Sequence, residues 1–410
     1  MAKYVIIGNS TAAVGCVEGI RSVDKTGDIT LISAEPYHTY SRPLISYLLE
    51  GRTDQEKMKY RPDDFYTENG ITARLGERVA EIDPKEKTVT LESGEQIPYE
   101  KLLHAAGSVP FIPHIDGLDT VKKKFTFMSL DDAKALEAAI TGKSRVLILG
   151  AGLIGLKCAE GILKRVKSVT VVDLADRVLP SILDTMGAEI VKAHLEKQGL
   201  QFRLNDTVEV FHKNKATLKS GGTLDFDVLV LAVGVRPSVS LIENAGGSVR
   251  RGIATDENGR TSLPDVFAAG DCAESYDISS GTSRVLALLP NAYFQGHAAG
   301  VTMAGGREEL KKAIPMNAIG FMGMHILTAG TYTGDTYTVR DGDNYKILFY
   351  ESDLLRGFIL IGDVARAGIY TALIRERTPL STIDFDLICE KPQLMAFTAK
   401  ARKELLAAQR

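Results

Sequence analysis

The sequence is poor in the residues that mark several classes of metalloprotein. It has no tryptophan and only four cysteines, Cys16, Cys158, Cys272 and Cys389, which form neither a C-x-x-C motif nor a close pair. This spacing disfavours a structural zinc site and an iron–sulfur cluster. The seven histidines stand singly, without the spacing of metal ligands. We therefore predict no metal site.

The chain also lacks a charge excess and a long apolar run. Its 49 Lys and Arg residues nearly balance 52 Asp and Glu residues, and the net charge of −3 comes without a basic block. We expect no nucleic-acid partner and no membrane association. No apolar run approaches the roughly 18 residues of a membrane span, and a strand begins too near residue 1 to leave room for a signal peptide. A cytoplasmic location is the expectation.

What is present is the composition of an ordinary globular protein, with 44% hydrophobic and 25% charged residues. The length of 410 residues exceeds that of one compact domain, so two or three domains are expected. The most informative stretch, residues 145–173, has the order strand, glycine-rich turn, helix, strand, acid. Its landmarks are the apolar run 146–149, Gly150, Gly152, Gly155, the apolar run 169–172 and Asp173.

This order and the spacing G-x-G-x-x-G predict a dinucleotide-binding unit. Gly150 permits the tight turn, Gly152 lets a pyrophosphate approach the backbone, and Gly155 lets the helix lie close to the strand. Asp173 would accept hydrogen bonds from an adenosine ribose and repel a 2′-phosphate, which favours NADH over NADPH. The alternative interpretation is a tight packing turn without a ligand.

A weaker copy of this unit lies at the N-terminus. Gly8, Ser10 and Ala13 stand where the three glycines stood, and Glu35 follows the second strand, 29–33, as the acid. The helices of the two copies match in register, with Cys16 and Cys158 at the same offset. Two units of one kind predict two bound dinucleotides.

Three later strands end in small residues or an acid. The predicted strand 99–106 ends in Ala106 and is followed by Gly107, and the predicted strand 227–233 is followed by Gly234 in the same way. Small residues at a strand end allow close approach of a cofactor, although a simple turn explains Gly107 equally well. Asp271 closes a third short strand, 266–271, at the edge where α/β sheets bind ligands.

Other segments carry weaker expectations. The aromatic loop 36–45 is a plausible lid over a planar ring system, with Arg42 as its cation, although a solvated arginine explains it as well. The small residues of 290–305 predict a helix packed closely on a sheet. From Met316 onward, strand-like runs, a helix near 364–377 and a helix after Pro392 predict a third domain with an antiparallel sheet.

In this order the landmarks resemble the two-dinucleotide-binding-domain flavoproteins of the pyridine nucleotide–disulfide oxidoreductase superfamily. Ser41–Leu44 and Arg356–Asp363 are most similar to NADH:rubredoxin oxidoreductases and the flavoprotein part of nitrite reductases. The resemblance implies an α/β fold with two Rossmann-like (three-layer ββα) domains and a C-terminal α+β interface domain. The implied ranges are 1–110 and 235–312 for FAD, 111–234 for NAD, and 313–410 for the interface domain, which often forms homodimers in the family.

The resemblance also implies two sets of site residues. The FAD set is Gly8, Ser10, Ala13, Glu35, Arg42, Val79, Ala106, Gly107 and Asp271. The NAD set is Gly150, Gly152, Ile154, Gly155, Asp173 and Gly234.

The departures from the family matter as much. The segment 42–48 lacks the redox cysteine of disulfide reductases. Lys157 stands where the family often has a glutamate, and Tyr47 stands near the position of a partner lysine. Lys157 would place a positive charge near a reduced flavin, or it would simply face solvent. No catalytic acid or base is named.

We therefore predict an FAD-dependent NADH:acceptor oxidoreductase that passes electrons to a small redox protein of the rubredoxin or ferredoxin type, without a redox-active disulfide. One alternative is an NADH oxidase, or a reductase of a small molecule or a disulfide. Another, of a different class, is a redox-responsive flavoprotein subunit of a larger complex.

Overall fold

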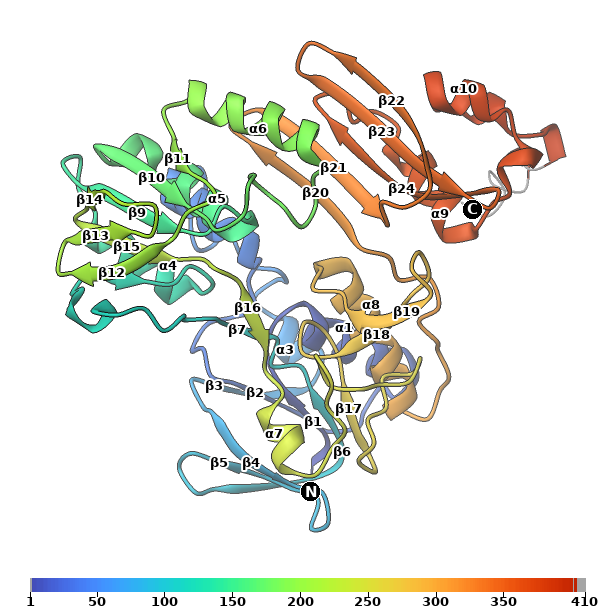
Figure 1. The fold of residues 1–410 in the computed structure, drawn as a ribbon. Coiled ribbons are helices and arrows are strands. Elements are labelled where there is room, and N and C mark those ends of the chain that lie inside the picture. The colour runs from blue at the N-terminus through green and yellow to red at the C-terminus, as the bar shows by residue number, and fades with distance from the viewer. Residues whose placement is uncertain (1, 401, 404–410) are drawn as a thin grey trace. The chain divides into compact units, whose positions relative to one another are not determined.

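The computed structural model describes residues 2–400, 402 and 403, and they fall into two compact units (Figure 1). The first unit comprises Met1–Asp176, Gly199–Tyr276 and Ser283–Lys311, and the second comprises Arg177–Gln198, Asp277–Thr282 and Lys312–Arg410. The predicted FAD, NAD and interface ranges remain predictions.

The first unit contains a sheet that begins at the N-terminus. Its parallel strands lie in the order β3-β2-β1-β6-β17, with bounds β1 (Ala2–Ile7), β2 (Ile29–Ser33), β3 (Ile71–Leu75), β6 (Gln96–His104) and β17 (Val266–Ala268). The hairpin of β4 (Val79–Asp83) and β5 (Thr88–Leu91) extends it through an antiparallel pairing with β6. Strands from residues 2–104 and from residues 266–268 therefore share one sheet.

Two helices of this unit lie side by side with their backbones in contact (Figure 1). They are α1 (Thr11–Val23) and α8 (Leu289–Met303). A Cβ added at Gly296 of α8 would lie 1.9 Å from the Ala12 carbonyl oxygen, and one at Gly15 of α1 would lie 2.3 Å from the Tyr293 carbonyl oxygen. The sequence predicts close packing of α8 on a sheet, but its glycines instead contact α1.

A second parallel sheet of the first unit has the order β11-β10-β9-β15-β8. Its strands are β8 (Lys124–Phe125), β9 (Arg145–Leu149), β10 (Ser168–Val172), β11 (Gln201–Arg203) and β15 (Val228–Leu231). Helices α4 (Leu130–Ala139) and α5 (Leu153–Ile162) and an antiparallel sheet of β12 (Val208–His212), β13 (Lys215–Leu218) and β14 (Thr223–Asp225) complete this part. Two parallel sheets with helices confirm the α/β class.

Short elements connect these sheets. The antiparallel pair β7 (Ser108–Pro110) and β16 (Val235–Pro237) joins the segments that leave and re-enter the first sheet. The remaining elements of this unit are α2 (Ile45–Glu50), α3 (Phe65–Glu68), α7 (Ser240–Asn244), and the 3₁₀ turns Arg42–Leu44, Leu118–Thr120 and Leu163–Arg165. A hairpin of β18 (Glu274–Asp277) and β19 (Thr282–Val285) precedes α8.

The second unit is built on an antiparallel sheet with the order β20-β21-β24-β23-β22. Its elements are α6 (Thr185–Lys197), β20 (Met316–Phe321), β21 (Met324–Gly330), β22 (Asp335–Asp341), β23 (Asn344–Glu351), β24 (Leu354–Ile361), α9 (Ala367–Glu376), α10 (Phe385–Glu390), and the 3₁₀ turns Leu380–Thr382 and Leu394–Ala396. Phe358 and Tyr370 pack between the sheet and α9.

The helix predicted after Pro392 begins later than expected, because residues 399, 400, 402 and 403 are α-helical but the residues before them are not. Leu394–Ala396 form a single 3₁₀ turn, and Phe397 has extended backbone angles. Positions 401 and 405 of that prediction lie outside the described residues. In the part of the chain that the structure describes, no helix has the length and apolar character that crossing a bilayer requires.

Candidate functional site

The turn between β1 and α1 has the backbone geometry of a phosphate-binding turn. Gly8 has a φ of +122°, and a Cβ there would lie 2.3 Å from the Ala105 carbonyl oxygen. Ser10 caps α1 in extended conformation, and its side chain makes no capping hydrogen bond. No acidic side chain stands in the first turn of the helix. The helix N-terminus therefore offers its N–H groups and positive dipole to an anion.

The turn between β9 and α5 repeats this geometry. Gly150 has a φ of +111°, and a Cβ there would lie 2.2 Å from the Ala232 carbonyl oxygen. A Cβ at Gly155 would lie 2.0 Å from the Gly150 carbonyl oxygen, whereas one at Gly152 meets nothing within 4 Å. The space over Gly152 is thus open on the side from which a ligand would approach.

The same backbone hydrogen bonds hold both turns. The Gly8 N–H donates to Ile32 on the neighbouring strand at 2.8 Å, and the Gly150 N–H donates to Val172 at 2.8 Å. Ala105 and Ala232 donate to the residue before each turn glycine at 2.7 and 2.8 Å. The Gly8 and Gly150 turns are therefore similar in structure as well as in sequence.

The two predicted ribose-binding acids have different surroundings. Asp173 is half-buried, and its two oxygens accept from the Ala151 N–H at 2.5 Å and the Ala175 N–H at 2.8 Å. These bonds hold the carboxylate beside the glycine turn. Glu35 instead forms an ion pair with Arg42 and accepts from the Tyr40 hydroxyl at 2.7 Å.

Arg42 therefore contacts Glu35, the acid of the N-terminal dinucleotide-binding copy. Its guanidinium also donates to the Met128 carbonyl at 3.1 Å and lies 5.3 Å from the centre of the Tyr40 ring. The Tyr40 hydroxyl accepts from the Leu130 N–H at 3.0 Å. The loop predicted as a lid is thus tied to Glu35 and to the start of α4. No motif in the sequence indicates this role of Tyr40.

Two buried polar atoms of the same loop have no hydrogen-bond partner among the described residues. They are the Thr39 hydroxyl and the His38 Nε2 atom. Buried polar groups are nearly always paired, with protein, water or a ligand. The Gly8 turn, the acid-free helix start and these two atoms fit a large polar ligand such as FAD at this turn.

The strand-end residues lie where the sequence places them. Gly107 and Gly234 both have positive φ, +67° and +110°, and they flank the β7–β16 pair. Asp271 follows the buried end of β17, and burial raises the pKa of its carboxyl, with Arg42 acting in the opposite direction. The preceding Gly270 N–H donates to the Gln295 side chain at 2.6 Å. Sequence reasoning missed Gln295, which sits on α8.

Two predicted residues have less distinctive places. Val79 is buried in the core at the start of β4, opposite Leu91. Ile154 is half-buried in the first turn of α5. Neither side chain makes a contact that assigns it to a ligand, so their predicted roles remain predictions.

Lys157 forms a mostly buried ion pair with Glu160. Its ammonium lies 2.6 Å from the Glu160 carboxylate, one helical turn on, and 5.2 Å from the centre of the Tyr47 ring. Arg52 lies over the same ring at 4.6 Å. Side-chain exposures of 21% for Lys157 and 6% for Glu160 show that neither simply faces solvent.

All four cysteines are buried and unpaired as thiols. Burial raises the pKa of each, to about 12 for Cys272 and about 11 for Cys389. A thiolate is the reactive form, so these thiols are poor nucleophiles near neutral pH. No group of three His, Cys, Asp or Glu side chains within residues 2–400, 402 and 403 has the arrangement of a metal site.

Comparison with known proteins agrees with this geometry. The chain is 31% identical over 394 residues to the NADH-dependent phenylglyoxylate dehydrogenase subunit epsilon of Aromatoleum evansii, covering 93% of both. It is 31% identical over 307 residues to the rubredoxin-NAD(+) reductase of Pseudomonas putida, covering 73% of this chain and 80% of that protein. Three other relatives are longer, and the chain covers only 45–49% of their length.

The fold has a close counterpart among solved structures. The reductase in the covalent putidaredoxin reductase–putidaredoxin complex superposes with a TM-score of 0.87 at 22% identity, over 99% of this chain and 98% of that one. The family model described as pyridine nucleotide-disulphide oxidoreductase matches residues 2–296. The chain therefore belongs to the pyridine nucleotide-disulphide oxidoreductase family and is an FAD-dependent NAD(P)H oxidoreductase.

Proposed function

We propose that the protein takes hydride from NADH through FAD and delivers electrons to a small redox protein of the rubredoxin or ferredoxin type, without a thiol relay. The observation that carries this proposal is the state of the four cysteines, which are buried and have raised pKa values. Relatives that share about a third of the sequence include a rubredoxin-NAD(+) reductase.

We assign FAD to the first turn. When bound, FAD supplies a ring system that accepts a hydride and returns electrons to an acceptor. Gly8, Ser10 and Ala13 would lie under its pyrophosphate, with the N-terminus of α1 facing the phosphates. Glu35 would accept hydrogen bonds from the adenosine ribose through lone pairs that Arg42 and Tyr40 leave unused. Ala106, Gly107 and Asp271 would contact the remainder.

Arg42 acquires a different role from the one the sequence predicts. Because its guanidinium pairs with Glu35, we assign it as a positioning residue that fixes the carboxylate toward the ribose. Tyr40 supports the same carboxylate from the other oxygen.

We assign NADH to the second turn, with Gly150, Gly152 and Gly155 under the pyrophosphate and Ile154 and Gly234 beside it. Asp173 supports NADH over NADPH, because its carboxylate is held at the turn by two backbone N–H groups and would repel a 2′-phosphate. The chain must then hold the nicotinamide against the flavin at short range with water excluded.

An anaerobic titration with NADH tests this proposal. Loss of the visible flavin band at one NADH per FAD is the expected result. Uptake of a second equivalent, or a long-wavelength band between a thiolate and flavin, would reveal a redox disulfide and refute it. Homodimer formation through residues 313–410 remains a prediction, to be checked by sedimentation.

A second candidate function has a specific observation in its favour. A relative that the chain matches over 93% of both lengths is named as a subunit of a larger dehydrogenase. In that role the acceptor would be a partner subunit rather than a diffusible protein. Slow reduction of added rubredoxin and ferredoxin, together with co-purification of a redox partner, would favour it.

A further inference from the structure

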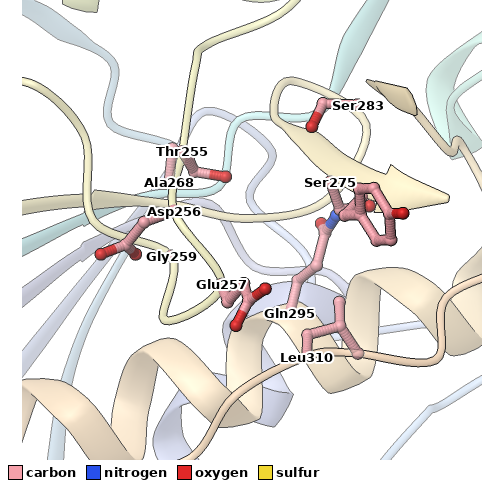
Figure 2. Close-up of a pocket in the computed structure, with 10 residues that line it drawn as sticks. Thr255, Asp256, Glu257, Gly259, Ala268, Ser275, Ser283, Gln295 and Leu310 are labelled. Carbon is pink, nitrogen blue, oxygen red and sulfur yellow. The ribbon is translucent and has the colours of Figure 1, made fainter. Parts of the chain in front are cut away.

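A pocket of about 230 Å³ lies in the first unit beside the outer edge of the first sheet (Figure 2). Its walls come from the segment before β17, the β18–β19 hairpin, α8 and the chain that follows α8. The lining residues are Thr255, Asp256, Glu257, Gly259, Ala268, Ser275, Tyr276, Ser283, Gln295 and Leu310. None of the residues assigned to either dinucleotide is among them.

The pocket holds buried polar atoms without partners. Gln295 is only 6% exposed, and its Nε2 atom has no hydrogen-bond partner in the part of the chain that the structure describes. The Ser275 hydroxyl oxygen is also buried and unpartnered there. Figure 2 shows the Gln295 side chain extending from α8 toward Ser275. Leaving a buried amide N–H unpaired is unfavourable, so this site is suited to a ligand with an acceptor atom.

The orientation of Gln295 is fixed from outside the pocket. Its Oε1 atom accepts from the Gly270 N–H at 2.6 Å. That bond directs the two Nε2 hydrogens away from Gly270, because the amide plane cannot turn without losing it. The amide is therefore a preorganised donor.

The charge at the pocket is negative. The Lys311 ammonium contacts Glu309 at 2.5 Å and attracts the Glu257 carboxylate only through its charge. Among the described residues, no hydrogen bond or ion pair engages that carboxylate. Asp256 is occupied by the Asn258 and Arg260 N–H groups, both at 2.9 Å, and points away from the other lining side chains in Figure 2. No lysine, arginine or histidine lines the pocket. An anion is therefore disfavoured, and a cation has one carboxylate to meet.

The remaining walls match a hydroxylated ligand. The Ser275 and Ser283 hydroxyls can each donate and accept, and the Thr255 hydroxyl, which donates to the Glu274 carbonyl at 2.7 Å, can still accept. The Tyr276 ring, 40% exposed, offers a face for stacking. An apolar cavity of about 150 Å³ accepts benzene. A pocket of about 230 Å³ therefore has room for one substituted six-membered ring.

We propose that this pocket binds a small polyhydroxylated amine of the size of one amino sugar, with a ring oxygen or hydroxyl accepting from Gln295 and the ammonium facing Glu257. Because Gln295 also holds Gly270, next to Asp271, the ligand would sit one side chain away from the proposed FAD site.

The test compares three six-membered rings on the FAD-loaded protein by ligand-observed NMR and titration calorimetry. D-glucosamine, at a pH at which its amine is protonated, is expected to bind saturably and about tenfold tighter than D-glucose, while D-glucuronate does not bind. Glu257→Gln should reduce glucosamine to the affinity of glucose. The matched control Glu243→Gln changes an exposed glutamate on α7 and should have no effect.

A blocking variant keeps the test independent of charge. Ser283 is exposed on β19, so Ser283→Phe should fold normally and close the pocket to glucosamine. Absence of saturable binding for all three sugars overturns the proposal. Equal binding of glucose and glucosamine, or unchanged glucosamine binding in Ser283→Phe, overturns it as well.

Discussion

The three glycines of the second turn have different surroundings, so alanine at each should act differently. At Gly152 an added Cβ meets nothing within 4 Å, and the residue has ordinary extended angles, φ −82° and ψ −174°. At Gly155 the added Cβ would lie 2.0 Å from the Gly150 carbonyl oxygen, which is backbone and cannot turn aside. Gly152→Ala thus separates ligand binding from folding, and Gly155→Ala does not.

The expected magnitudes follow from these contacts. Gly152→Ala should stabilise the protein by a few tenths of a kcal/mol, because alanine lowers the conformational entropy of the unfolded chain. It should lose a similar amount because alanine is a poorer N-cap than glycine, so the free energy of unfolding should stay within about 1 kcal/mol of wild type. Gly155→Ala should lose about 1–3 kcal/mol or more, because a backbone overlap of more than 1 Å must be relieved. If the pyrophosphate lies over Gly152, the new methyl displaces it by about 1 Å, which can cost about 100-fold in rate.

Three measurements on each variant distinguish the effects. Circular dichroism gives the melting temperature, absorbance gives the FAD content, and anaerobic stopped-flow mixing gives the rate of flavin bleaching by NADH. Gly152→Ala should match wild type in the first two and bleach about 100-fold more slowly at low NADH. Gly155→Ala should melt several degrees lower.

Two results would refute the reasoning. Normal bleaching in Gly152→Ala would mean that the pyrophosphate does not lie at this turn. A large loss of melting temperature in the same variant would mean that the space over Gly152 is not open in the protein.

The remaining predictions concern specificity, thiols and pH. Asp173→Ala should lower the preference for NADH over NADPH about tenfold in kcat/KM, and an unchanged ratio contradicts the assigned role. Cys272→Ala should leave turnover with ferredoxin or rubredoxin within about twofold of wild type. Loss of turnover would instead be evidence that Cys272 takes part in a thiol relay. The hydrogen bond from Lys3 is the main cause of the lowered pKa of Asp24 in the folded protein. The ionised Asp24 therefore stabilises the fold above the unfolded-state pKa of about 3.9, and this contribution is lost as the pH falls below it. Asp24→Ala should therefore melt lower than wild type at neutral pH, with the gap closing in acid; a constant gap excludes this linkage.

Local sequence signals predicted local structure well. Ser129 with an acid three residues later, Asp132, is the sequence signature of a helix start, and the structure has the full capping box there, at the start of α4. The turn glycines were predictable because positive φ is required at Gly8 and Gly150. These features depend on residues only a few positions apart, where the physical requirement is visible in the sequence.

Features that depend on distant partners could not be predicted in the same way. The ion pair between Glu35 and Arg42 spans a loop with no periodicity, so the two residues were given separate roles. Gln295 on α8 meets Gly270 only because the helix returns to the first sheet. The glycines of α8 signalled close approach but not to which element. Glycines in a helix therefore indicate that another backbone comes close, but only the fold shows which element that backbone belongs to.

The contact between α1 and α8 also bears on how the protein forms during synthesis. Roughly 270 residues separate the two helices, and ribosomes add about 5–20 residues per second, so α1 waits about 15–50 seconds for its partner to emerge. Throughout that interval the face of α1 that carries Gly15 and Gly19 has no backbone to pack against. The phosphate-binding turn is then complete only after the second dinucleotide unit has been translated. The nascent chain would therefore be able to fold its second nucleotide unit before its first.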